Sequence, residues 1–142
     1  MKKFLSISVF ILSGLFSNSQ NCQWAHNIGS DWGSAQGIVT VDIAVDANNN
    51  TIVAGSFIGT ADFDPGSSVA SLTAGPQGNG FIAKYDAAGN FLWAKNLLAT
   101  SVMIILDFAL DNNGNIFVGG YFNDTCDFDP GNPVANLVSG SN

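Results

Sequence analysis

Residues 42–66 read DIAVDANNNTIVAGSFIGTADFDPG, and residues 107–131, which begin sixty-five positions later, read DFALDNNGNIFVGGYFNDTCDFDPG. The two stretches align without a gap, and 14 of their 25 positions are identical. Self-similarity at a fixed period of this length is the signature of a repeat architecture, in which each repeat is one supersecondary unit. The duplication therefore decides the fold, and the rest of the chain is interpreted around it.

Each copy begins with a predicted strand and a turn. Apolar residues alternate with polar or small ones in 41–46 and again in 106–111, and a period of two predicts β-strands. An Asp- and Asn-rich turn signal follows each strand, and Gly114 is suited to the left-handed backbone that closes such a hairpin. Asn49 stands at the position of Gly114, and Asn tolerates a left-handed backbone better than most other non-glycine residues.

Three further predicted strands complete one sheet in the first copy. Residues 51–57 are rich in β-branched and aromatic residues, as are residues 116–122 in the second copy, and both predict return strands. Residues 81–85 and 91–95 flank a third Asp-rich hairpin, in which Gly89 takes the left-handed position. Consecutive antiparallel strands of this number and length form a sheet of the size of a propeller blade.

The motif DFDPG ends the duplicated stretch in both copies. A Pro-Gly pair after Asp predicts a turn, because Pro presets one backbone angle and Gly accepts a positive one. We expect the phenylalanine of the motif to pack the turn onto the sheet. The residues to which we assign this structural role are Pro65, Gly66, Pro130 and Gly131.

The N-terminus predicts export. Two lysines precede an apolar run at 4–16, which is the layout of a secretory signal peptide. The run is too short for a membrane-spanning helix, which needs about 20 apolar residues. Small residues lie just before Gln20, so we expect residues 1–19 to be removed and residues 20–142 to be secreted, or held at the cell surface, without a stable membrane anchor.

The charge balance narrows the range of partners. The chain contains eleven Asp, no Glu and no Arg, and beyond the predicted signal peptide Lys84 and Lys95 are its only lysines. So acidic a chain lacks the basic footprint of nucleic-acid-binding proteins, and it is equally unsuited to anionic membrane surfaces. The partners that the sequence leaves open are an unknown extracellular ligand and other repeat units.

A second repeated motif sets the boundaries of the repeats. Residues 24–27 read WAHN and residues 93–96 read WAKN, an offset of 69 rather than 65, so the first connection is longer. This connection, 27–40, contains three glycines and predicts a loop. We place repeat 1 at about 24–92 and repeat 2 at about 93–142, where the sequence stops before a third strand of that repeat.

These motifs, in this order and spacing, resemble a known family. Asp-x-x-Gly-Asn hairpins, Gly-x-Phe strand ends at 55–57 and 120–122, DFDPG and the run FIAKYDAAGNFLWAK at 81–95 resemble the SBBP family, the seven-bladed β-propeller repeats of secreted bacterial proteins. The resemblance implies propeller blades on large exported proteins and no catalytic residues. With fewer than two repeats, the expected fold is an incomplete all-β propeller of about one and a half to two four-stranded antiparallel blades.

The DFDPG carboxylates are the best candidates for chemistry, and they are Asp62, Asp64, Asp127 and Asp129. Paired carboxylates serve glycoside hydrolysis and also bind calcium. We assign no cofactor and no metal, and calcium at these four aspartates is the one metal that the sequence leaves open. A catalytic pair normally occurs once per active site, whereas these pairs occur in both copies, which favours a role in the turns. A secreted carboxylate-dependent hydrolase or lyase and a calcium-stabilised adhesion module remain as alternatives.

The sequence offers few other candidates for catalysis or ligand contact. His26 is the only histidine and occupies the place of Lys95, and no serine motif completes a catalytic triad, so we assign no catalytic residue. Trp32 lies in the longer first connection without a counterpart, and it is our candidate for ligand contact. Cys22 and Cys126 would be able to pair in an oxidising compartment, and the sequence leaves their pairing open.

These patterns predict an exported scaffold or binding segment without catalysis. Because a propeller needs about four to eight blades, we expect either a fragment of a larger secreted protein or a self-associating unit. A sheet without its neighbour exposes an apolar face, and such faces associate. We expect residues 102–106, VMIIL, to be the most exposed part of that face.

Overall fold

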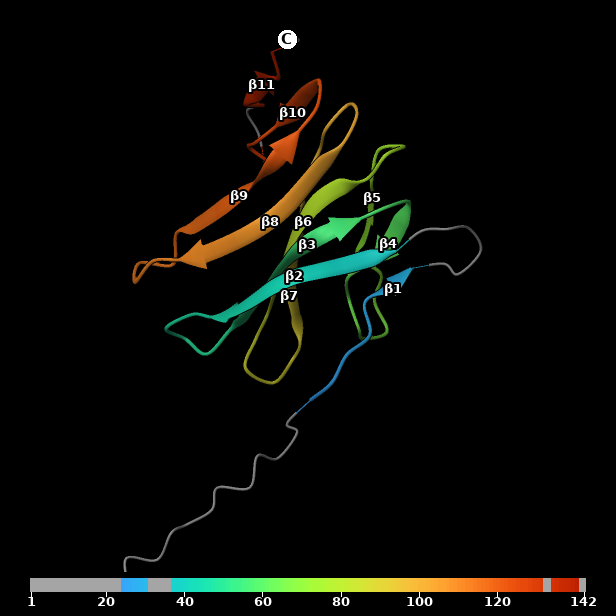
Figure 1. Ribbon diagram of the computed structural model, residues 1–142. Helices are drawn as coiled ribbons and strands as arrows, with labels where there is room; N and C mark the ends of the chain where they lie inside the picture. The colour runs from blue at the N-terminus through green and yellow to red at the C-terminus, as the bar shows by residue number, and fades with distance from the viewer. Residues whose placement is uncertain (1–23, 31–36, 132–133, 141–142) are drawn as a thin grey trace, which may run out of the picture.

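The computed structural model describes residues 24–30, 37–131 and 134–140. In these residues all regular secondary structure is β-strand, and two antiparallel sheets lie against each other (Figure 1). The first sheet has four strands in the order of the sequence: β2 (Ile38–Val45), β3 (Thr51–Phe57), β6 (Asn79–Tyr85) and β7 (Phe91–Leu97). The second sheet consists of β8 (Met103–Leu110) and β9 (Ile116–Phe122). The prediction of an all-β fold built from partial propeller blades is confirmed.

Short strands on one side of the sheets were not predicted from the sequence. A three-stranded sheet contains β1 (Gly29–Ser30), β4 (Thr60–Asp62) and β5 (Ser71–Thr73), and its counterpart pairs β10 (Thr125–Asp127) with β11 (Asn136–Val138). The expectation that 27–40 is a loop is therefore wrong at β1 and at the start of β2. Strands of two or three residues are too short to show a period in the sequence. Two of the pairings, β4–β5 and β10–β11, span the DFDPG turns, and only β1 pairs with a distant segment.

The pairing of these short strands follows the repeat. Ser30 pairs with Ala61, and Ala99 forms an isolated bridge with Cys126. The first members of the two pairs differ by the offset of 69 and the second members by the offset of 65, so the pairs are equivalent. In each repeat, the segment that follows a WAHN or WAKN motif thus pairs with the hairpin that carries DFDPG.

The three Asp-rich hairpins share one geometry. The residue that closes each turn has a positive φ: 61° at Asn49, 87° at Gly89 and 81° at Gly114. The aspartate that opens each turn accepts hydrogen bonds through Oδ1 from the backbone N–H groups two and four residues later, at 2.8 to 2.9 Å. Local side-chain bonds of this kind hold the turn independently of the packing around it.

The DFDPG turn is also held by its own carboxylates, in a way that differs from the expected turn type. Neither Gly66 nor Gly131 has a positive φ. Instead, the N–H of each donates to Oδ1 of the aspartate two residues earlier, Asp64 or Asp129, at 2.8 and 3.1 Å. An added Cβ at Gly66 would lie 3.0 Å from Oδ1 of Asp64, so close approach to the carboxylate explains the glycine.

Alternation along the strands gives the first sheet two apolar faces. We call face A the side that presents Ile52 and Ala54 of β3, and face B the side that presents Val53 and Phe57 of the same strand. Face A packs against the second sheet in one buried cluster. Face B is covered in part by the buried ring of Phe63 and by other residues around the β4–β5 hairpin.

The most exposed apolar residues are not where the sequence suggested. In the run 102–106, Met103 and Ile105 are buried against face A, whereas Leu106 is exposed. The register of β8 with β9 shifts between Ile105 and Asp107, so Leu106 is the extra residue of a β-bulge. The expectation that this run is the most exposed part of an apolar face is therefore wrong, because the first sheet covers Met103 and Ile105.

Candidate interaction surfaces

The contact between the two sheets is a cluster of buried apolar side chains. It joins Ile52, Ala54 and Ile82 of the first sheet to Ile105 and Phe108 of the second in one cluster of buried side chains. Phe108 lies on the face of the second sheet that corresponds to face B, since it is the counterpart of Ile43. Face A of one repeat thus packs on face B of the next.

A side-chain hydrogen bond crosses this contact, and a buried asparagine beside it holds β6 to β7 and to the segment before β6. The N–H of Ile105 donates to Oγ of Ser56 at 3.2 Å, a hydrogen bond between the sheets. Asn79 is fully buried: its Oδ1 accepts from the N–H of Gly75, and its Nδ2 donates to the carbonyl oxygen of Leu97 at 3.1 Å. Sequence reasoning missed Asn79, since its repeat counterpart would lie beyond the end of the chain and a single Asn carries no pattern.

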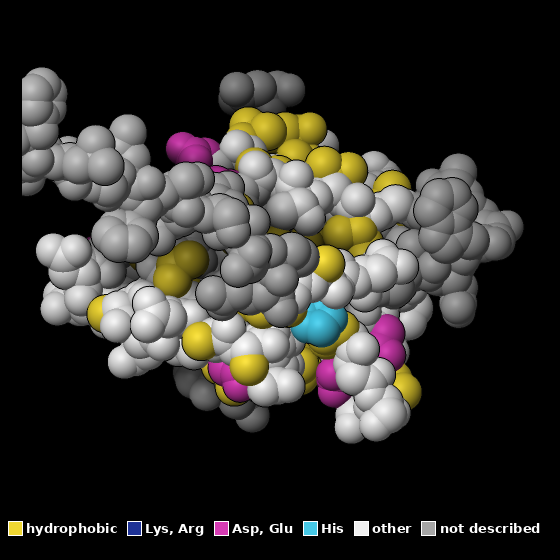
Figure 2. Space-filling model, turned by 90° about the horizontal axis from the view of Figure 1, so that it is seen from below, with side chains coloured by type: hydrophobic (Ala, Val, Ile, Leu, Met, Phe, Trp, Pro, Cys, Tyr) yellow, Lys and Arg dark blue, Asp and Glu magenta, His cyan; other side chains and the backbone are white. Residues whose placement is uncertain are grey.

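Each outward face of the two sheets keeps an uncovered part. On face B of the first sheet, Ile43 is 59% exposed, and Val45 beside it is also exposed. On face A of the second sheet, Phe117 is 59% exposed, and Tyr121 on the same strand is also exposed. Figure 2 shows hydrophobic side chains scattered on the surface of the molecule seen from below, with acidic side chains near its margins. Exposed apolar surface of this extent on strands marks interaction sites.

Face B of the first sheet is hollowed beside Ile43. A cavity of about 210 Å³ lies there, lined by Trp24, His26, Ile28, Thr40, Ile43, Val53 and Tyr85. The ring of Trp24 stacks on that of His26 with centroids 5.1 Å apart. Tyr85 donates through its hydroxyl to the carbonyl oxygen of Phe63 at 2.9 Å. Burial, followed by the charges of Asp64 and Asp62, raises the pKa of Tyr85 to about 12, so this phenol stays protonated and acts as a donor.

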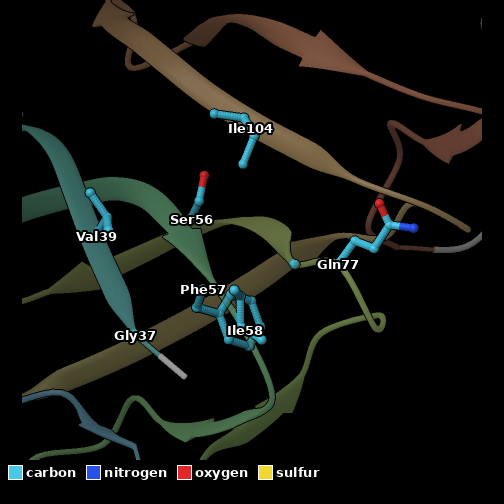
Figure 3. Close-up of a pocket in the computed structure, with 8 residues that line it drawn as sticks. Gly37, Val39, Ser56, Phe57, Ile58, Gln77 and Ile104 are labelled. Atoms are coloured by element: carbon cyan, nitrogen blue, oxygen red, sulfur yellow. The ribbon is translucent and has the colours of Figure 1, made fainter. Parts of the chain in front are cut away.

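A second, smaller cavity lies where the two sheets diverge. Its volume is about 120 Å³ and its lining is almost entirely apolar, with contributions from β2, β3, β8 and the segment before β6. Figure 3 shows Val39 and Ile104 on separate strands, with Ser56 between them. Val39 and Ile104 are equivalent in the two repeats. The cavity contains no titratable side chain, so it offers packing space rather than chemistry.

The candidate carboxylates are occupied within their own turns. Oδ1 of Asp62 accepts from the N–H groups of Asp64 and Ala70 at 3.0 and 2.8 Å. Oδ1 of Asp127 accepts from the equivalent groups, the N–H of Asp129 and of Ala135, at 3.0 and 2.9 Å. Within the described ranges, no three His, Cys, Asp or Glu side chains gather as a metal site would require.

Several predicted features lie outside the described residues, namely the signal peptide at 1–19, Cys22 and Trp32. Cys126 is described and fully buried, and burial raises the pKa of its thiol. His26 lies beside Trp24 at the cavity on face B, exposed and outside any strand. In the part of the chain that the structure describes, no helix has the length and hydropathy needed to cross a membrane.

The chain is similar to the uncharacterized WD repeat-containing protein L264 of Acanthamoeba polyphaga mimivirus, with 32% identity over 116 residues. The alignment covers 72% of this chain and 8% of that protein, so the chain spans less than a tenth of the length of this curated relative. No family model matches the chain, and no solved structure matches it.

The stacked antiparallel sheets, their repeat-related pairing and this similarity together define a β-propeller-type repeat protein. The relative is viral, and its printed name describes repeats rather than an activity. It therefore supports the propeller class without supporting the SBBP family or a bacterial source.

Proposed function

We infer that the chain is an SBBP-type propeller-repeat segment of an exported bacterial protein, and that it acts as a scaffold or binding surface without catalysis. The observation that carries this proposal is the use of repeated residues for packing and turns. Positions shared by the two copies build hairpins or buried contacts between sheets, and the described carboxylates of DFDPG accept backbone hydrogen bonds in both copies. The family assignment itself depends on the motifs, since no family model matches.

The partners follow from the uncovered faces. Apolar sheet faces that match the internal contact suit other propeller repeats, either in a longer chain or in further copies of this one. An unidentified extracellular ligand is the other partner class, and the acidic composition argues against nucleic acid. Calcium is not part of the proposal, because the candidate aspartates are held in turn hydrogen bonds.

Export is tested by the state of the N-terminus. Expressed with its own first 19 residues in a bacterial host, the protein is expected outside the cytoplasm with Gln20 as its first residue, which mass spectrometry of the intact protein detects. A matched variant with Lys2 and Lys3 replaced by Asp should be retained and unprocessed. Recovery of the wild-type chain with Met1, attached to the membrane, would contradict the export part of the proposal.

The absence of catalysis is tested at the DFDPG turns. Asp62→Asn and Asp127→Asn remove the charge from carboxylates that hold backbone N–H groups, so a structural role predicts a lower unfolding temperature for both variants. The control is Asp124→Asn, which changes an acidic residue of the second repeat outside this motif. If both DFDPG variants melted like the wild type, and a hydrolytic activity of the wild type were lost in them, the hydrolase alternative would replace the scaffold.

A further inference from the structure

Each uncovered face has an internal partner that shows what it fits. Inside the chain, face A of the first sheet packs on face B of the second, with Ile52 and Phe108 in the same buried cluster. The counterpart of Ile52 in the second repeat is Phe117, and the counterpart of Phe108 in the first repeat is Ile43. These two counterparts are exposed, one on the uncovered part of each outward face.

The larger and the smaller side chain change faces between the internal contact and the outward faces. The internal contact brings a smaller residue of face A, Ile52, into the same cluster as a larger residue of face B, Phe108. On the uncovered faces the larger residue is on face A, as Phe117, and the smaller is on face B, as Ile43. A contact between them would therefore bring together the same pair of side chains, with the sizes reversed, and volume-conserving exchanges are those that packed interiors tolerate best.

The surface around Ile43 has room for the larger ring. The cavity of about 210 Å³ on face B is lined by Ile43 together with Thr40, whose counterpart Ile105 is fully buried in the internal contact. Face B of the first sheet thus has a cavity beside Thr40, whereas the larger side chain of Ile105 occupies the equivalent place on the second sheet. Opposite, Gly119 stands where the first repeat has Ala54, so the backbone beside Phe117 carries no side chain that would prevent close approach.

We propose that face A of the second sheet binds face B of the first sheet in a second copy of this chain, with Phe117 inserted beside Ile43. This inference rests on the proposed scaffold function and names its partner. The contact joins two different surfaces, so it is head-to-tail and generates rings or filaments. The internal contact is made by β2, β3 and β6 of the first sheet against β8, with Ile116 and Phe122 of β9 packed against it; the proposed contact uses β2 of one copy and β8 and β9 of the other.

Association is measured by sedimentation velocity over a concentration series of the purified chain. The wild type is expected to associate, and Ile43→Asp and Phe117→Asp should each raise the concentration of half-association by roughly tenfold or more, because a charge would be buried in an apolar contact. Val138→Asp is the matched control, since Val138 is exposed on β11, which belongs to the separate β10–β11 sheet, and this variant should associate like the wild type.

The size exchange provides a sharper test. Ile43→Phe alone would place two phenylalanines together, and Phe117→Ile alone would leave a void, so each should weaken association by roughly tenfold. The double variant restores the Ile and Phe pair of the internal contact and should associate within about threefold of the wild type. Circular dichroism of each variant checks that the monomer is folded, as expected for substitutions at exposed positions.

Cross-linking identifies the contacting residues. In a Cys22→Ala background, oxidised mixtures of Ile43→Cys and Phe117→Cys chains that carry tags of different mass should give mainly the mixed dimer, and Val138→Cys chains should give little of any dimer. A wild-type chain that stays monomeric, equal yields of all cross-links, or a double variant as weak as the single ones would each overturn this inference. Export and processing at Gln20 would be unaffected, so failure of the proposed function is scored separately.

Discussion

The two repeats place equivalent residues in opposite environments. Ile52 of the first repeat is 2% exposed, whereas its counterpart Phe117 is 59% exposed; Phe108 of the second repeat is 5% exposed, whereas its counterpart Ile43 is 59% exposed. The backbone pairing around these positions is the same in both repeats. The difference therefore comes from the neighbouring sheet, since Ile52 and Phe108 are buried where the two sheets meet, whereas no sheet of the described chain covers Ile43 or Phe117.

The largest expected effect tests this contrast directly. Phe108→Ala should lower the free energy of unfolding by about 3–5 kcal/mol, because it removes a buried ring from the contact between the sheets. Ile43→Ala changes the equivalent position on the uncovered face, and its cost in the monomer should stay within about 0.5 kcal/mol. Urea unfolding at low protein concentration measures both values. Similar costs for the two variants would show that face B of the first sheet is covered in solution.

A second pair of variants compares two strand glycines whose positions in the repeat are adjacent, Gly55 of the first repeat and Gly119 of the second. An added Cβ at Gly55 would overlap the carbonyl oxygen of Val39 and lie 2.9 Å from the ring of Phe81, so Gly55→Ala should cost more than about 1 kcal/mol. Gly119 corresponds to Ala54, and its added Cβ would approach no atom closer than 3.9 Å. Gly119→Ala should leave the unfolding temperature unchanged or raise it slightly. Equal destabilisation by the two substitutions would contradict the bulge geometry that the repeats share.

The hairpins allow a comparison in which packing plays no part. Gly114 has a φ of 81° and open space where a Cβ would lie, so Gly114→Val should cost about 1 kcal/mol or more from backbone strain alone. Gly114→Asn reproduces the residue that closes the first hairpin, Asn49, and should cost clearly less. Thermal unfolding measures the cost of each substitution, and equal melting temperatures for the two variants would contradict a left-handed backbone at Gly114.

The smallest effect concerns acid stability. A hydrogen bond and ion pair with Lys84 at 2.8 Å, followed by hydrogen bonds from Asn50 and Asn48, hold the pKa of Asp46 well below its usual range. A carboxyl with a depressed folded-state pKa stabilises the fold above its unfolded value of about 4, and this stabilisation is lost as the pH falls below that value.

The matched carboxyl in the second repeat lacks the lysine. Hydrogen bonds from Asn115 and neighbouring backbone groups also lower the pKa of Asp111, but no ion pair is recorded for it among the described residues. Asp46→Asn should therefore flatten the fall in melting temperature between pH 6 and pH 3 more than Asp111→Asn does. Calorimetry over that range measures the slopes, and a steeper acid dependence in Asp46→Asn than in the wild type would refute the assignment.

The hairpins were predictable because their chemistry is local. The Asp, Asn and Gly residues of each turn interact within five positions, so the residues at 46–50 and 111–115 indicated their own geometry, including the left-handed backbone at Asn49. The DFDPG turn was located for the same reason, but its glycines serve the approach of a carboxylate rather than a positive φ. That distinction depends on the direction of the aspartate side chain, which a sequence motif does not show.

Alternation and the repeat period alone determined the four strands of the first sheet, the hairpins and the equivalence of the two copies. Only the tertiary structure decided which face of each strand is buried, because an alternating pattern marks two faces but does not say which has a neighbour. It also decided the short strands β1, β4 and β5, of which β1 pairs with residues more than thirty positions away in β4, and the burial of Met103 and Ile105. Burial depends on which sheets meet, and in this molecule the contact between the sheets buries one of two equivalent repeat positions and leaves the other exposed.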